Sequence, residues 1–177
     1  MVVVTSGGWS TPETDVMETV GEAVDGARGV LATVIAVEGS AYRRPGAKMV
    51  IGDGNGVGAV TAGCLEAEIV ALAKQVRDRG HLQIEQFDLT GGDDVWGLGV
   101  GCNGVIDVML EPLTGGYRPV VEAYERGENT VVLTVVDGDG TTVERGDRTV
   151  LFPAESGADC FALGAPDWQK KRREERE

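Results

Sequence analysis

The apolar positions of this chain follow a helical period in some segments and a strand period in others, and glycine or proline marks each change. Residues 64–79 carry the clearest helical pattern, an apolar stripe with spacings of 4, 3 and 4 positions. The stripe consists of Leu65, Ile69, Leu72 and Val76. Two arginines in the last turn and Gly80 just beyond it match the preferences of a helix C-terminus. A helix is therefore predicted from about Cys64 to Arg79.

Two further helices are indicated by their end signals rather than by a long stripe. Ser10 stands three positions before Glu13, which is the spacing of a capping box, and Gly26 or Gly29 would end the helix that follows. A shorter helix is predicted for residues 119–126, because a proline opens this segment and a glycine follows it directly.

Segments rich in β-branched residues alternate with the helices and predict strands. The predicted strands cover residues 31–37, 48–51, 57–61, 82–87, 105–110, 130–136 and 142–151. Glycine-rich turns at 52–56 and 137–140 join neighbouring strands into hairpins. This order of elements favours an α/β domain of α+β character, with a mixed β-sheet, hairpins and about three helices. We expect a single domain over residues 1–153 and an irregular charged tail over residues 154–177.

Acidic residues outnumber basic residues by 29 to 16 in the 177-residue chain, so the net charge is −13. Such a surface repels nucleic acids and anionic membranes, and neither is expected as a partner. The sequence shows no apolar run of about twenty residues and no secretion signal at its start, which predicts a cytoplasmic protein with reduced thiols. The edges of the predicted hairpins favour a homo-oligomer.

Three segments lack an evident packing role, and the first is a loop that holds Ser40, Arg43 and Arg44, followed by Lys48. Flanking glycines let the backbone approach a ligand closely. Two guanidinium groups and an ammonium group suit a phosphate or a carboxylate. The alternative is a solvated turn whose arginines pair with surface carboxylates. In so acidic a chain, an anion bound here must be held by local geometry, because the overall field opposes it.

The second segment is residues 61–66, at the predicted start of the central helix. A thiol at Cys64 would lie near free N–H groups and the positive end of the helix dipole, which favour the thiolate. Glu66 in the first turn acts against that shift by like-charge repulsion, and Gly63 leaves space for a ligand. The alternative is a small buried cysteine at a strand-to-helix junction.

The third segment is a glycine-rich run at residues 97–104 that contains Gly101, Cys102 and Asn103. A β-rich run rather than a helix follows it, so it is not the glycine loop of a dinucleotide-binding domain. It is either a glycine-lined wall that places Cys102 and Asn103 against a ligand or a crowded turn. Together, two thiols in glycine-rich loops and one cationic loop fit a small ligand that is soft at one end and anionic at the other.

Metal binding and hydrolysis are both disfavoured by the sequence. His81 lies 17 residues after Cys64 and 21 residues before Cys102, and these spacings match no zinc template. It is the single histidine, and no nucleophile-elbow sequence is present, which argues against a hydrolase. We therefore assign no catalytic residue and no metal ligand.

Several short motifs follow one another along the chain in a characteristic order. They are residues 30–34, 39–49, 63–66, 97–102 and 111–113. In this order they resemble the XdhC/CoxI family, the accessory proteins of xanthine dehydrogenase and aerobic carbon monoxide dehydrogenase, over roughly residues 10–150. The resemblance implies an XdhC/CoxI-like domain that binds the molybdenum cofactor (molybdopterin) as cargo, protects it during sulfuration and delivers it to an apo molybdenum hydroxylase. A cysteine desulfurase is a further candidate partner.

The resemblance also suggests roles for the three loops. The terminal phosphate of molybdopterin would meet Arg43, Arg44 and Lys48, and its dithiolene–metal end would meet Cys64 and Cys102. The candidate cofactor-binding residues are Ser40, Arg43, Arg44, Lys48, Gly63, Cys64, Glu66, Gly101, Cys102 and Asn103.

The chain departs from the family pattern at several points. Family members usually have a proline where Tyr42 stands, and paired glycines where Ala62 and Asn103 each precede a glycine. Many members continue into a Rossmann-like domain, where this sequence shows a charged tail, so nucleotide binding is not predicted. Either that domain is a separately encoded partner, or this member works without it. The leading interpretation is a chaperone without turnover. The alternatives are a thiol-dependent sulfur transferase acting on the cofactor, and a purely structural partner of the dehydrogenase.

Overall fold

The computed structural model describes residues 13–26, 28–52, 56–90, 103–137, 144–153 and 160–163. The chain divides into two compact units, residues 1–113 and residues 114–177. The sequence predicts one domain up to residue 153 and does not anticipate a division after Leu113. Helices occur together with antiparallel sheets, so the α+β character that the sequence predicts is confirmed. No helix among the described residues is long and apolar enough to cross a membrane.

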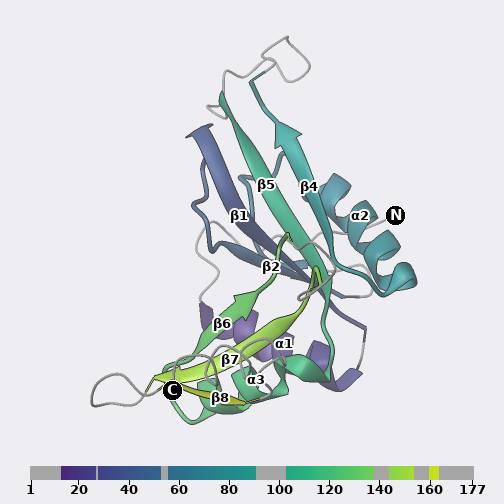
Figure 1. Ribbon diagram of the computed structural model, residues 1–177. Helices are drawn as coiled ribbons and strands as arrows, with labels where there is room; N and C mark the ends of the chain where they lie inside the picture. The colour runs from purple at the N-terminus through teal and green to yellow at the C-terminus, as the bar shows by residue number, and fades with distance from the viewer. Residues whose placement is uncertain are drawn as a thin grey trace. The chain divides into compact units, whose positions relative to one another are not determined.

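The first unit is built on a five-stranded sheet with the strand order β3-β2-β1-β5-β4 (Figure 1). The strands are β1 (Val30–Ser40), β2 (Lys48–Ile51), β3 (Gly56–Gly58), β4 (Gln83–Asp88) and β5 (Asn103–Pro112). Each neighbouring pair among these strands runs antiparallel. The hairpin predicted around residues 52–56 is confirmed as the β2–β3 pair.

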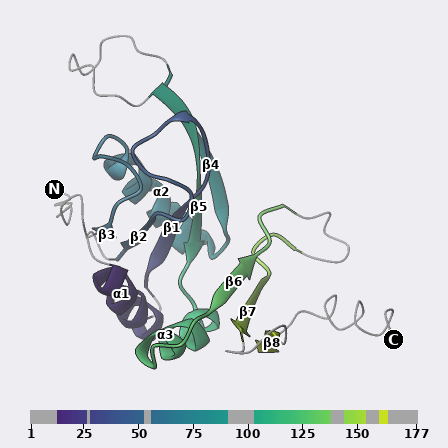
Figure 2. The ribbon, with the colours of Figure 1, turned by 90° about the vertical axis from the view of Figure 1, so that its left-hand side faces the viewer.

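Two helices pack on this sheet. Helix α1 (Glu13–Gly26) contacts β2 and β3 and buries Val16, Val20 and Val24 (Figure 2). Helix α2 (Glu66–Arg79) contacts β1 and β5. It begins two residues later than predicted and ends as predicted, because Gly80 takes a left-handed φ of 70° and its N–H donates to the carbonyl of Val76.

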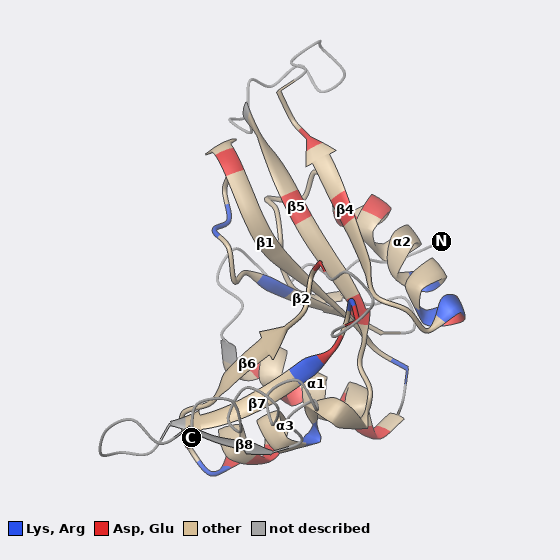
Figure 3. Ribbon diagram, viewed as in Figure 1, with Lys and Arg blue, Asp and Glu red and all other residues tan. Residues whose placement is uncertain are grey.

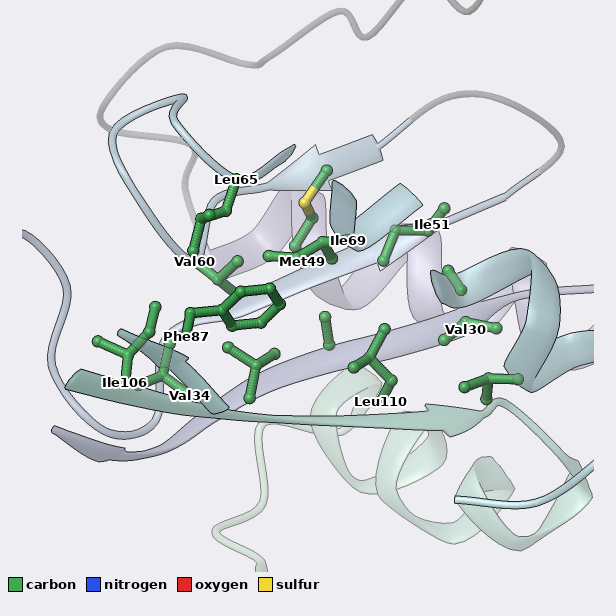
Figure 4. Packing of buried hydrophobic residues seen from close by; sticks show 14 residues of the cluster. Val30, Val34, Met49, Ile51, Val60, Leu65, Ile69, Phe87, Ile106 and Leu110 are labelled. Carbon is green, nitrogen blue, oxygen red and sulfur yellow. The ribbon is translucent and has the colours of Figure 1, made fainter. Parts of the chain in front are cut away.

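The main core lies between α2 and one face of the sheet (Figure 4). Ile69, Ala73 and Val76 of α2 are at most 2% exposed and meet residues from all the long strands. The strand residues in this core are Val30, Ala32, Val34, Met49, Ile51, Phe87, Ile106, Val108 and Leu110. Each fully buried aliphatic side chain contributes roughly 1.5–3 kcal/mol of transfer free energy, so this layer fixes α2 firmly on the sheet.

The β1–β5 ribbon is longer than the sequence predicts. Its register runs to the pair Ser40 and Asn103, with a bulge between Val34 and Ala36. The polar and glycine residues at the end of β1 resemble a loop in sequence, yet backbone pairing extends through them. A Cβ at Gly104 would lie 2.9 Å from both the N and the O of Ser40, so only glycine fits this close approach of the two strands.

The second unit contains a short 3₁₀ turn η1 (Gly115–Tyr117), helix α3 (Arg118–Glu125) and a three-stranded sheet in the order β6-β7-β8. Its strands are β6 (Val131–Thr134), β7 (Arg148–Pro153) and β8 (Cys160–Leu163). Strand β8 falls inside the segment that the sequence assigns to an irregular tail, which corrects that assignment. A run of four residues is too short for its pattern to predict a strand, and these residues form one because they pair with β7.

Candidate functional site

The three loops singled out by the sequence leave the same end of the five-stranded sheet. Strand β1 ends at Ser40 and β2 begins at Lys48, so the cationic loop 41–47 joins them at this end. Strand β3 ends here at Gly58, before the segment 59–65 that leads into α2. Strand β4 ends here at Asp88, before the glycine-rich run that leads into β5. Antiparallel pairing gives these exits a common direction, and the registers place Gly58 level with Ala32 of β1 and Asp88 level with Glu38.

The cationic loop 41–47 is fastened to β1 along its second half. Gly46 takes a φ of 98°, its N–H donates to the carbonyl of Val34 at 2.8 Å, and the N–H of Val34 donates to the carbonyl of Ala47 at 2.9 Å. Arg44 and Lys48 are exposed, and Arg43 is half-buried. Lys48 donates from Nζ to the carbonyl of Gly46 at 2.9 Å, which holds its ammonium group beside the loop. Blue in Figure 3 marks the lysine and arginine positions between β1 and β2. The second half of the loop backbone is therefore fixed, while Arg44 and Lys48 face solvent and Arg43 does so in part.

The segment before α2 forms a short arch, residues 61–65, whose flanks are buried. Val60 is 1% exposed and Leu65 is 8% exposed, and both belong to the main core. Between them Gly63 and Cys64 are exposed, and Cys64 is a free thiol. Gly63 has a φ of 111°, a conformation that side-chain-bearing residues rarely adopt. The alternative of a buried structural cysteine at this junction is therefore wrong.

Two polar side chains are buried beneath the arch. Thr61 and Glu66 are each 5% exposed, and the Thr61 hydroxyl donates to Oε1 of Glu66 at 2.8 Å. The second oxygen of Glu66 accepts the N–H of Leu65 at 3.2 Å, and the Thr61 oxygen accepts the N–H of Gly63 at 3.3 Å. The sequence predicts Glu66 as a ligand contact and does not single out Thr61. The only signal for Thr61 is a hydroxyl at a strand-to-helix junction.

The glycine-rich third loop is described only at its borders. Gly101 and Cys102 lie outside the described residues, and Asn103 is described through its backbone as the first residue of β5. Its Cα pairs with that of Ser40, and the N–H of Leu89 donates to the carbonyl of Gly104 at 2.9 Å. Contact of Cys102 with a ligand stays a prediction.

Parts of all three loops contact the main core. Val60 and Leu65 of the arch segment pack in the cluster that contains Phe87 and Ile106 (Figure 4). Ala41, at the start of the cationic loop, and Leu89, just after β4, pack against the same cluster. The cationic loop, the arch and the entry to the third loop therefore all contact the same core cluster, which is their common apolar base.

His81 lies at the opposite end of α2 from Cys64. The helix has 14 residues, and a rise of about 1.5 Å per residue separates its ends by roughly 20 Å. A metal site that joins His81 to Cys64 is incompatible with this distance. Among the described residues, no group of three or more His, Cys, Asp and Glu side chains is arranged to hold a metal ion.

Comparisons with known proteins find similarity over the part of the chain that contains the cationic loop and the arch. Residues 23–88 match the model of the XdhC and CoxI family. A probable xanthine dehydrogenase subunit of Bacillus subtilis (strain 168) is 38% identical over 92 residues, which cover 51% of this chain and 28% of that protein. The chain therefore spans less than a third of this relative.

A solved structure shares the fold. The crystal structure of a xanthine dehydrogenase from Bacillus halodurans matches with a TM-score of 0.63 and 29% sequence identity. The match covers 89% of this chain and 47% of the other, so the chain spans about half of that protein. Both the cationic loop and the Gly63–Cys64 arch fall within the family match at residues 23–88.

Proposed function

We propose, because residues 23–88 match the XdhC and CoxI family, that this chain is an accessory protein of a molybdenum hydroxylase. In this role it binds the molybdenum cofactor and supports its sulfuration and its insertion into an enzyme such as xanthine or carbon monoxide dehydrogenase. The apo hydroxylase is the recipient, and a cysteine desulfurase is the candidate sulfur source. A protein with a Rossmann-like domain is a further candidate partner.

The observation that carries this proposal is the common base shared by the cationic loop and the arch. Arg43, Arg44 and Lys48 offer charge-assisted hydrogen bonds to a terminal phosphate. The thiol of Cys64 is exposed at the same end of the sheet and suits the softer dithiolene–metal end of the cofactor. The donor types thus match a ligand with one anionic end and one soft end.

The net charge of −13 sharpens this argument. An anion approaching the chain meets a repulsive field, so binding requires cationic groups on a backbone that is already ordered. The hydrogen bonds of Gly46 and Ala47 to β1 provide this order on the second half of the loop. A flexible arginine-rich turn would lose more conformational entropy on binding.

The test is cofactor retention in cells supplied with molybdate. The full chain is purified, and bound metal and pterin fluorescence are measured for wild type and for the double variant Arg43→Ala, Arg44→Ala. Loss of charge-assisted contacts to a phosphate should reduce retention by at least about tenfold. The matched control is Lys74→Ala with Arg79→Ala, which removes the same charge from the exposed face of α2 and should leave retention unchanged. Equal retention by both double variants would contradict the proposed function.

The exposed thiol of Cys64 favours one second candidate, a sulfur transferase acting on the cofactor. Cys64→Ala distinguishes the two roles. A cofactor-binding chaperone should lose some affinity and still support sulfuration by an external donor. A transferase should retain cofactor and lose sulfuration completely.

A further inference from the structure

The Gly63–Cys64 arch has two independent sets of contacts with the rest of the first unit. Val60 and Leu65 anchor its flanks in the apolar core. Thr61 and Glu66 bind each other and the arch backbone through hydrogen bonds. The apolar anchors hold both ends of the segment on the sheet. The conformation of the backbone between these anchors is then determined by the polar pair.

The hydrogen bonds close the arch into a ring. The Thr61 hydroxyl donates to Oε1 of Glu66, five residues further along, and its oxygen accepts the N–H of Gly63. The other Glu66 oxygen accepts the N–H of Leu65. One side chain thus contacts the backbone on the N-terminal side of Cys64, the other contacts it on the C-terminal side, and the two are joined.

This ring replaces the usual start of a helix. Leu65 occupies the N-cap position of α2 and provides no side-chain cap. At most helix starts a short polar side chain at that position would accept an N–H of the first turn. Here the carboxylate of the first helical residue reaches back to the N–H of Leu65, near the positive end of the helix dipole. The polar atoms of Glu66 are directed into the arch and away from solvent.

The ring also explains the conformation of Gly63. A φ of 111° turns the chain outward, and a Cβ at this position would meet nothing within 4 Å, so packing does not impose the conformation. The N–H of Gly63 bound to Thr61 fixes the turn from inside. Cys64 then follows on the exposed side of the arch.

We propose that Thr61 and Glu66 are positioning residues that hold the Gly63–Cys64 arch in one conformation and present the Cys64 thiol to the bound cargo. This inference deepens the proposed function and rests on it in one respect, that the arch meets the cofactor. It gives Glu66 a role beneath the arch in place of direct ligand contact, and it adds Thr61 to the functional residues.

The test compares Thr61→Val, which keeps the shape and removes the hydroxyl, with Thr61→Ser, which keeps the hydroxyl. The first readout is amide hydrogen exchange at Leu65, measured by NMR on the full chain. The N–H of Leu65 bonds to Glu66, so Thr61→Val leaves its acceptor in place. If the ring acts as a unit, exchange at Leu65 should still accelerate by about five- to thirtyfold in Thr61→Val, and stay within about twofold of wild type in Thr61→Ser.

The second readout is cofactor retention from molybdate-fed cells. Thr61→Val should retain less cofactor than wild type, and Thr61→Ser should restore it. Unchanged hydrogen exchange at Leu65 in Thr61→Val overturns the inference. Faster exchange together with undiminished cofactor retention also overturns it, because the pair would then stabilise the arch without affecting the cofactor. If wild type itself retains no cofactor while the exchange results hold, the proposed function fails and the ring stands. Should Thr61→Val not fold, Glu66→Gln leaves one carbonyl oxygen for two donors and must accelerate exchange at Leu65 in the same way.

Discussion

Replacing Gly104 with alanine should open the end of the β1–β5 ribbon from which the cationic and glycine-rich loops depart. The added Cβ would lie 2.9 Å from the N and the O of Ser40, and closer still to the carbonyl oxygen of Glu38. Ordinary contact begins near 3.4 Å, so the backbone of β1 must retreat by at least about 0.5 Å at Ser40. All three atoms belong to backbone, so no side-chain rotation can relieve the clash.

The magnitude follows from the contacts that this shift disturbs. One or two ladder hydrogen bonds lengthen beyond useful geometry, and each contributes about 0.5–1.5 kcal/mol net. The bond from the N–H of Leu89 to the carbonyl of Gly104 lies at the same position. Overpacking strain adds about 1–3 kcal/mol. We expect Gly104→Ala to lower the free energy of unfolding by about 2–4 kcal/mol.

Urea unfolding followed by far-UV circular dichroism measures this loss. The matched control is Gly26→Ala at the end of α1, where a Cβ would meet nothing within 4 Å and φ is not positive. That change should be neutral or stabilise by up to about 1 kcal/mol, because alanine restricts the unfolded chain. A cost for Gly104→Ala below about 0.5 kcal/mol would refute the close approach of the two strands.

Three further outcomes follow from the described contacts. Ile69→Ala, at a position 0% exposed between α2 and the sheet, should cost about 2–5 kcal/mol in urea unfolding, and Ile69→Val about 0.5–1.5 kcal/mol; equal costs would contradict the packing. Gly63→Ala should destabilise by about 1–3 kcal/mol, because alanine at a φ of 111° is strained, and a neutral result would show that the arch relaxes. Burial raises the pKa of Tyr117 far above its usual range, so the folded chain keeps a phenol proton that the unfolded chain loses near pH 10. The free energy of unfolding should therefore fall as the pH rises above about 10. Urea unfolding at a series of pH values should show a smaller fall for Tyr117→Phe, which has no phenol to titrate.

Local sequence pattern predicts the helices better than the extent of the strands. The stripe in α2 and the cap at Gly80 are short-range signals, and they place this helix to within two residues. The ends of β1 and β5 escape prediction because Gly39 and Ser40 resemble a loop, while their pairing with Gly104 and Asn103 comes from a partner more than sixty residues away. Strand β8 depends in the same way on β7.

The candidate site divides along the same line. Residue type and glycine context point to Arg43, Arg44 and Cys64, and their exposure or partial exposure follows from loops that cannot enter the core. In the sequence Glu66 is a charge in an exposed first turn, and Thr61 does not stand out. Their burial depends on α2 docking against the sheet, which no local pattern encodes.

The direction in which the three loops leave the sheet is easier to predict than their detailed geometry. In a sheet whose neighbours all run antiparallel, β1, β3 and β4 run in the same direction, so their exits face the same end of the sheet. The registers place the exit of β4 level with Glu38, close to the end of β1, and the exit of β3 level with Ala32. The opposite end receives the β2–β3 turn and the link from α2 to β4, which carries Gly80 and His81. The cationic residues and the exposed thiol are thus on one end, and the single histidine is on the other. Among the described residues of the first unit, the exposed thiol lies at the first end, so a ligand with an anionic and a soft end would meet both donor types there. The arch and the cationic loop are therefore the targets for paired substitution.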